Sequence, residues 1–131
     1  WSKDPSTKVG ARIVDAQHRV ISEGFNGPPR GVNDDPNIDR ETKLRRTIHA
    51  EKNAILFAQR DLTGATLYVT HFPCSQCAAL IVQAGIKQVV TRPPAPAFFE
   101  RWKGDIEEAE RIFADAGVDW VALTRTEQAN T

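Results

Sequence analysis

Alternation of apolar and polar residues near the start of the chain predicts two β-strands. In KVGARIVDA and HRVISEGFNG, apolar side chains recur at about every second position, which is the period of a strand with one buried face. Gln17 and His18 separate the two runs, so we expect a hairpin with strands at Val9–Asp15 and Val20–Phe25. The segment 26–39 is rich in Gly, Pro, Asn and Asp, and its length favours a binding loop over a simple connector.

Helix and strand patterns alternate along the rest of the chain. Good helix formers with periodic apolar positions predict helices over about 46–59, 74–85 and 105–117. Short apolar runs predict strands at ATLYVTH, IKQVVTR and VDWVALT. The order ββαβαβαβ predicts an α/β fold in which the strands after Ala65 are parallel. Ligands of such sheets bind beyond the carboxyl ends of the strands, where HFPC lies.

The two cysteines of the chain and one histidine form a candidate metal site. A catalytic zinc takes three protein ligands and keeps a fourth position for water, and two Cys with one His is a known ligand set. His49, Cys74 and Cys77 supply three such ligands. The cysteines begin a predicted helix, whose N-terminus stabilises thiolates, and two thiolates balance the charge of Zn²⁺.

Glu51 is the candidate acid–base group of this site. Residues two apart on a helix point about 200° apart, so His49 and Glu51 converge only on a metal beyond the N-terminal end of the helix. There, Glu51 would move a proton from a zinc-bound water to the leaving group. The alternatives are an exposed helix-forming glutamate, a thioredoxin-like redox pair of cysteines, and a structural zinc with His18 or His71 as fourth ligand.

These motifs resemble those of a known family. HAE and PCSQC match H-x-E…P-C-x-x-C, the signature of the zinc deaminases. With SKDPSTKVGARIV, GFNGPPRGVNDD, LYVTHFPCSQCAALIVQAGIKQVV and FADAGV, the chain resembles the deoxycytidylate (dCMP) deaminase family from about Ser2 to Val118. The resemblance implies a three-layer α/β/α cytidine-deaminase-like sandwich around a mixed five-stranded sheet. It also implies hydrolytic attack at C4 of cytosine, with release of ammonia.

The resemblance assigns roles to individual residues. It implies that His49, Cys74 and Cys77 hold Zn²⁺ and that Glu51 carries the protons. Because both cysteines are used by this site, we expect one Zn²⁺ per chain. Asn26 and Phe25 match substrate contacts of the family, and Ala50 matches a position whose backbone N–H meets the pyrimidine. Asn26, between two glycines, is also a typical turn residue.

Two parts of the substrate site are left open by the sequence. We expect Arg30 at the 5′-phosphate because a guanidinium suits phosphate, although a solvated loop arginine is the plainer interpretation. Its rivals for that role are Ser2, Lys3, Arg45 and Arg46. The candidates to close the pocket over the base are Phe98, Phe99 and Trp102, which are otherwise core or subunit-contact residues. Phe72 is a further candidate substrate contact.

Composition narrows the classes of partner and the cellular location. Lys plus Arg number 17 and Asp plus Glu 17, so the net charge of zero offers no basic excess for a nucleic acid polymer. The apolar runs are too short to cross a bilayer and no signal peptide is visible, so we expect a cytoplasmic protein.

A length of 131 residues predicts a single domain, 1–131. Because the chain opens with WSKDPST and contains no methionine, we expect that upstream residues are missing.

The expected function is zinc-dependent hydrolysis of a cytosine nucleotide, dCMP to dUMP plus ammonia, within pyrimidine nucleotide biosynthesis. One alternative keeps the chemistry and changes the substrate to CMP, a nucleoside or another amino-heterocycle. An alternative of a different class is a non-catalytic, zinc-containing nucleotide-sensing module. The resemblance further implies a homo-oligomer and dCTP and dTTP as effectors.

Overall fold

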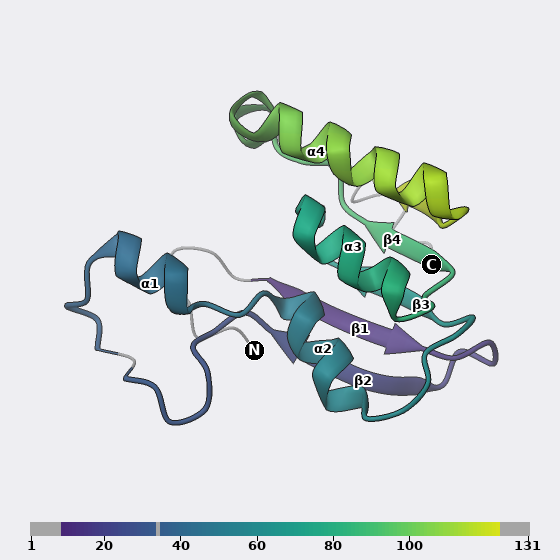
Figure 1. Cartoon of the computed structure of the whole chain (residues 1–131), viewed down its shortest axis with the longest axis horizontal. Helices are drawn as coiled ribbons and strands as arrows, with labels where there is room; N and C mark the ends of the chain where they lie inside the picture. Colours follow the sequence, from purple (N-terminus) through teal and green to yellow (C-terminus); the bar gives the residue numbers. More distant parts are fainter. Residues whose placement is uncertain (1–8, 34, 124–131) are drawn as a thin grey trace.

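A computed structural model describes residues 9–33 and 35–123. Within them lie five strands and four helices (Figure 1). In chain order the elements are β1 Gly10–Val14, β2 Val20–Phe25, α1 Arg40–Arg46, α2 Ala50–Ala58, β3 Thr66–Val69, α3 Ser75–Gln83, β4 Gln88–Thr91, α4 Pro96–Ala116 and β5 Asp119–Ala122.

The five strands form one mixed sheet in the order β2-β1-β3-β4-β5. β1 pairs antiparallel with both β2 and β3, which confirms the predicted hairpin. β3, β4 and β5 run parallel, as predicted for the strands after Ala65. The α/β class and the mixed five-stranded sheet are therefore confirmed, and β3 ends directly before the segment that carries the cysteines.

Helices α2, α3 and α4 pack on one face of this sheet (Figure 1). Their buried side chains join those of the strands in a single core. From the strands the core includes Ala11, Ile13, Leu67 and Val89, and from the helices Ala54, Ala78, Ile81, Ile106, Ala109 and Phe113. This shared core fixes the three helices relative to one another, and therefore fixes the ends that carry the candidate site.

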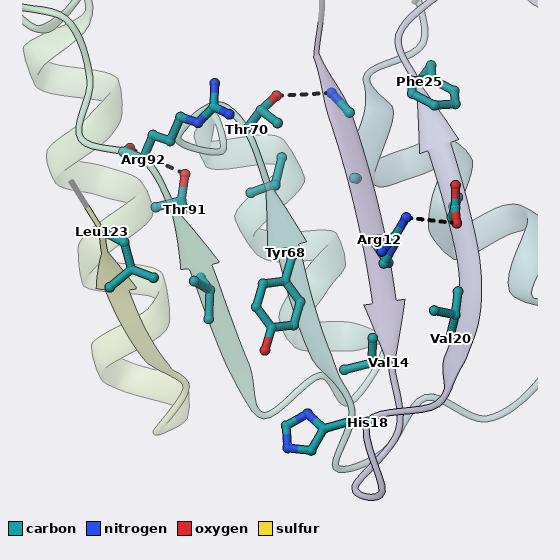
Figure 2. Close-up of a pocket in the computed structure, with 15 residues that line it drawn as sticks. Arg12, Val14, His18, Val20, Phe25, Tyr68, Thr70, Thr91, Arg92 and Leu123 are labelled. Atoms are coloured by element: carbon teal, nitrogen blue, oxygen red, sulfur yellow. Dashed lines mark hydrogen bonds and ion pairs between the residues drawn. The ribbon is translucent and has the colours of Figure 1, made fainter. Parts of the chain in front are cut away.

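The opposite face of the sheet is open in the described part of the chain. Figure 2 shows this face, on which Tyr68, Phe25 and the Arg12–Glu23 ion pair line a hollow of about 540 Å³. None of the residues that line this hollow belongs to a helix of the described residues 9–33 and 35–123. The same residues contain no helix that is both long and apolar enough to cross a membrane.

Glycine at position 24 allows α2 to lie directly against β2. A Cβ atom on Gly24 would stand 2.4 Å from the Ala54 nitrogen and 2.5 Å from the Ala50 oxygen, distances that real Cβ contacts do not show. Ser22 faces the same helix, and its hydroxyl donates to the Ala54 carbonyl at 2.7 Å. β2 therefore determines how closely α2 approaches the sheet.

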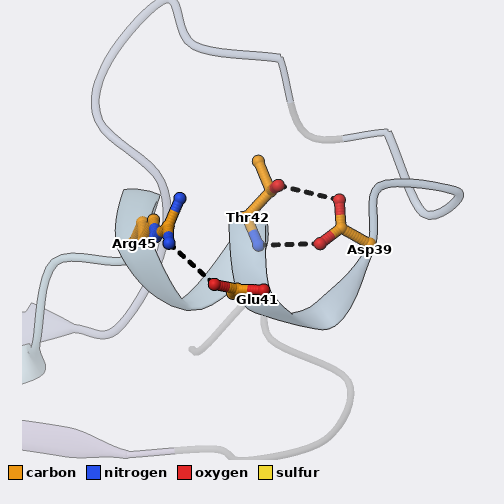
Figure 3. Close-up of polar contacts among 4 residues, drawn as sticks. All are labelled: Asp39, Glu41, Thr42 and Arg45. Carbon is orange, nitrogen blue, oxygen red and sulfur yellow. Dashed lines mark hydrogen bonds and ion pairs between the residues drawn. The ribbon is translucent and has the colours of Figure 1, made fainter.

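Helix α1 was not predicted from the sequence, because none of its residues is buried and it has no apolar face to produce a periodic pattern. Local polar contacts hold it instead (Figure 3). Asp39 caps its N-terminus by accepting from the Thr42 amide at 3.1 Å and the Thr42 hydroxyl at 2.7 Å. One turn further on, Arg45 pairs with Glu41 at 2.7 Å.

Two predicted helix starts were wrong. The helix expected over 46–59 begins at Ala50, because Ile48 is extended and pairs with Gly27 in an isolated antiparallel bridge. The helix expected from Asp105 begins at Pro96, since a proline is well suited to the first turn. Trp102, with φ −115° and ψ 17°, marks a kink between the two parts of α4.

Candidate active site

The site forms where the N-termini of α2 and α3 meet. His49 is the N-cap of α2 and Cys74 is the N-cap of α3, and both have extended backbone angles. The two helices pack against each other on the same face of the sheet (Figure 1). His49 thus lies at the N-terminal end of the helix that carries Glu51, the end beyond which the sequence predicts the metal position.

His49, Cys74 and Cys77 form a cluster that could hold a metal ion, with ligand atoms all within 4.8 Å of one another. The His49 Nδ1 atom lies 3.2 Å from the Cys77 sulfur and 3.6 Å from the Cys74 sulfur. Tetrahedral bonds of about 2.3 Å to sulfur and about 2.0–2.1 Å to nitrogen would place nitrogen and sulfur about 3.6 Å apart. The donor set and its spacing therefore fit one Zn²⁺, with a fourth position available to water.

The two sulfurs differ in environment. Cys77 is fully buried, whereas Cys74 is partly exposed and accepts from the Cys77 amide at 3.4 Å. A hydrogen bond with the Cys77 thiol lowers the pKa of Cys74 to about 4, and the same hydrogen bond together with burial raises the pKa of Cys77. One thiolate is thus already favoured, and binding a metal displaces the proton of the second.

Glu51 is buried beside this cluster, with 4% of its surface exposed, so it is not a solvated helix former. Burial raises the pKa of its carboxyl group above the ordinary value, and the nearby His49 offsets part of this rise. The hydrogen bond with Cys74 in turn raises the pKa of His49. A carboxyl group with a raised pKa suits proton transfer near neutral pH.

Of the predicted substrate contacts near β2, two lie close to the start of α2. Ala50 is the first residue of α2 and is fully buried. Asn26 is buried too, and its side-chain oxygen accepts from the Val9 amide at 3.1 Å, a contact between segments seventeen residues apart. Phe25 is not brought to the cluster: its ring lies over Gly10 on the open face of the sheet (Figure 2).

The predicted phosphate ligands are spread over the surface. Arg30 is exposed in the loop after β2, and Arg45 and Arg46 are exposed on α1. Arg45 is already paired with Glu41. Ser2 and Lys3 lie outside the described residues.

Among the aromatic candidates, Phe98 contacts the segment HFPC that carries Cys74. Its ring meets the ring of His71 edge-on, with 4.4 Å between the ring centres. Burial lowers the pKa of His71, and the nearby His49 lowers it further. Trp102 lies further out, half exposed, with its ring 6.3 Å from that of Phe98. Phe72 is buried against Trp120 at 5.2 Å, and so belongs to the core.

Sequence reasoning missed one polar contact beside the cysteines. Asp105 on α4 accepts from the Ser75 amide at 3.0 Å and from the Ser75 hydroxyl at 2.6 Å. These residues are thirty positions apart, and only the packing of α4 on α3 brings them together. An aspartate within the acidic run DIEEAE carries no signal that would single it out.

Taken together, the α/β fold, the Cys₂His cluster and the buried carboxyl group define a zinc-dependent deaminase. Residues 1–92 match the model of the family described as "Cytidine and deoxycytidylate deaminase zinc-binding region". The chain belongs to this family.

Relatives and solved structures agree with this assignment. A protein of Aliivibrio fischeri named "Uncharacterized deaminase in luxG 3'region" is 49% identical over 126 residues, covering 94% of this chain and 85% of the relative. The deoxycytidylate deaminase of Mus musculus is 43% identical over 134 residues, covering 94% of this chain and 71% of the relative. The dCMP deaminase of cyanophage S-TIM5, solved with dCMP and dUMP, superposes with a TM-score of 0.73 at 25% identity, covering 93% and 85% of the two chains.

Proposed function

We propose that the protein catalyses the hydrolytic deamination of a cytosine nucleotide, dCMP to dUMP plus ammonia. The observation that carries this proposal is the buried carboxyl group of Glu51 beside the His49, Cys74 and Cys77 cluster. Similarity to proteins named deoxycytidylate deaminase, one of them solved with dCMP and dUMP, supports the choice of substrate.

The residues of the site divide the chemistry between them. His49, Cys74 and Cys77 would hold the zinc, which when bound supplies the Lewis acidity that makes water nucleophilic at neutral pH. Glu51 takes a proton from the attacking water and delivers it to the amino group that leaves C4 as ammonia. Its burial keeps bulk water from competing for that proton, and its raised pKa allows it to hold the proton between the two transfers.

The resemblance to the family supports a substrate placement for the residues around the cluster. The Ala50 amide at the start of α2 would face the pyrimidine, and Asn26 would contact the sugar end from the adjoining turn. Arg30 in the exposed loop after β2 would meet the 5′-phosphate. Phe98, whose ring contacts His71, would cover the base.

A substrate panel tests the proposal. Zinc-loaded protein is mixed separately with dCMP, CMP, deoxycytidine and adenosine, and ammonia release is measured with and without a zinc chelator. We expect turnover of dCMP above all others, and its loss on chelation. Preference for CMP or deoxycytidine would support the alternative substrates. Stoichiometric zinc with no ammonia from any cytosine compound would instead support a nucleotide-sensing module.

A homo-oligomer, effector control by dCTP and dTTP, and a cytoplasmic location are further parts of this proposal. The first two rest on the resemblance to the family, and the third on the sequence. Sedimentation of the purified protein tests the first, and adding each triphosphate to the dCMP assay tests the second.

A further inference from the structure

We propose that Asp105 is a positioning residue for the zinc ligands Cys74 and Cys77. Its carboxylate receives two hydrogen bonds from Ser75, the residue that directly follows Cys74. One comes from the backbone amide at 3.0 Å and the other from the hydroxyl at 2.6 Å. Both contacts involve the first residue of α3, so the carboxylate fixes the turn from which both sulfurs project.

This arrangement answers a conflict at the start of α3. The N-cap residue of a helix normally supplies an oxygen that accepts from an amide of the first turn. Here the N-cap is Cys74, whose sulfur accepts from the Cys77 amide at 3.4 Å and is also needed by the metal. A carboxylate brought from α4 accepts from the Ser75 amide, a different donor of the same first turn, and places negative charge at the positive end of the helix dipole.

Asp105 is held firmly enough to act in this way. The next residue, Ile106, is buried, as are Ala109 and Phe113 on the same helix, and α4 packs along α3. The buried stripe anchors this part of α4 without the carboxylate. Replacing the carboxylate should therefore leave α4 in place and release only the first turn of α3.

The carboxylate acts through Ser75 and not on the metal. The cluster of ligand atoms within 4.8 Å comprises His49, Cys74 and Cys77, and Asp105 does not belong to it. Groups that orient metal ligands commonly alter metal affinity by about 10- to 100-fold when they are replaced. The effect should therefore appear in zinc retention and in the geometry around the metal.

The test compares Asp105→Asn and Ser75→Ala with Glu108→Gln, a matched control on the same helix whose carboxylate is exposed and pairs with Arg111. Zinc release to a chromogenic chelator is timed, and the Co²⁺-substituted protein is examined for its thiolate-to-metal absorption. We expect release about 10-fold faster in both variants, with a shifted Co²⁺ spectrum. The control should match the unmodified protein in both measurements.

The thermal midpoint of the zinc-free protein is measured for each variant. A positioning role changes zinc release and leaves this midpoint unchanged, whereas general support of the fold lowers the midpoint. Equal zinc release in Asp105→Asn, Ser75→Ala and the unmodified protein would overturn the proposal. So would faster release that the Glu108→Gln control shares. If Asp105→Asn does not fold, Ser75→Ala alone decides, since it removes one hydroxyl. The inference rests on the zinc site of the proposed function, but these readouts need no turnover, so a wrong substrate would not affect them.

Discussion

The N-termini of α2 and α3 each place a zinc ligand at the N-cap, yet they are held in different ways. At α2, the residue before His49 is fixed by backbone contacts: the Ile48 amide donates to the Gly27 carbonyl at 2.7 Å, and the Gly27 amide donates back at 3.1 Å. At α3, the residue after Cys74 is fixed by the Asp105 side chain of α4, a helix distant in sequence. The histidine end of the site therefore depends on the loop beside the sheet, and the cysteine end on helix packing.

Helix α2 is also tied along its length to β2. The Asn53 amide group donates to the Phe25 carbonyl at 2.7 Å, and Ser22 donates to the Ala54 carbonyl. No comparable set of contacts with a neighbouring strand is seen for α3 in the described residues, where α4 is its main partner. Changes in β2 should thus disturb His49 and Glu51, while changes in α4 should disturb the cysteines.

The largest effect is expected from Glu51→Gln, which changes the chemistry of the α2 end without changing its shape. Turnover of dCMP should fall by about 10²- to 10⁴-fold, because the amide cannot carry the proton. Zinc content should be unchanged, since Glu51 is not part of the cluster. Steady-state kinetics and metal analysis of the same sample measure the two quantities. Glu41→Gln on the exposed α1 is the control, and equal activity in both variants would remove Glu51 from the mechanism.

A smaller but clear effect is expected from Gly24→Ala, which tests the dependence of α2 on β2. The added methyl group would meet backbone atoms of α2 at 2.4 Å and 2.5 Å, and backbone cannot move aside as a side chain can. We expect a loss of about 1–3 kcal/mol in the free energy of unfolding, together with weaker zinc binding as His49 shifts.

Gly27→Ala is the matched control for that experiment, because a Cβ at Gly27 would meet nothing within 4 Å. Urea unfolding of the two variants gives the comparison. If Gly24→Ala proved as stable as Gly27→Ala, the close approach of α2 to β2 would not be required for the site.

The smallest effect is expected at α1, whose N-cap is an ordinary aspartate and not a metal ligand. Hydrogen bonds from the Thr42 side chain and backbone lower the pKa of Asp39 below its usual range. The cap therefore contributes stability above the ordinary aspartate pKa, and this contribution is lost as the pH falls through the lowered value. The Thr42 amide resonance, followed by NMR through an acid titration, should report the fraying of α1.

Asp39→Asn is the control for this titration, because asparagine caps a helix as well as aspartate does but carries no charge. The Thr42 resonance of that variant should not follow the acid transition. An identical transition in both proteins would assign it to another group.

The parts of the site that were predicted from the sequence are those whose chemistry is rare. A histidine and two cysteines have few other uses at such spacings. The acid–base role of Glu51 was predicted only because it lies two residues after His49. Phe25 shows why neighbouring positions were harder. A shift of one residue in a strand reverses the face to which a side chain points, so GFNG could not show that Gly24 faces α2 and Phe25 the open side.

For the fold too, elements with a clear local pattern were predicted and those without one were missed. The hairpin and the parallel strands produce apolar patterns and were predicted, whereas α1 has no buried residue and produces none. The start of α4 at Pro96 was missed because a run of prolines and alanines also suits a rigid loop. The contact between Asp105 and Ser75 depends on how two helices pack, and no local pattern encodes it.

The kink at Trp102 divides α4 into two parts that contact different regions around the site. The part after it holds Asp105 and the buried stripe, while the part before it carries Phe98 beside His71. Because we propose that Phe98 covers the base, substitutions in residues 96–101 should alter the preference between one amino-heterocycle and another while leaving the cluster of His49, Cys74 and Cys77 intact.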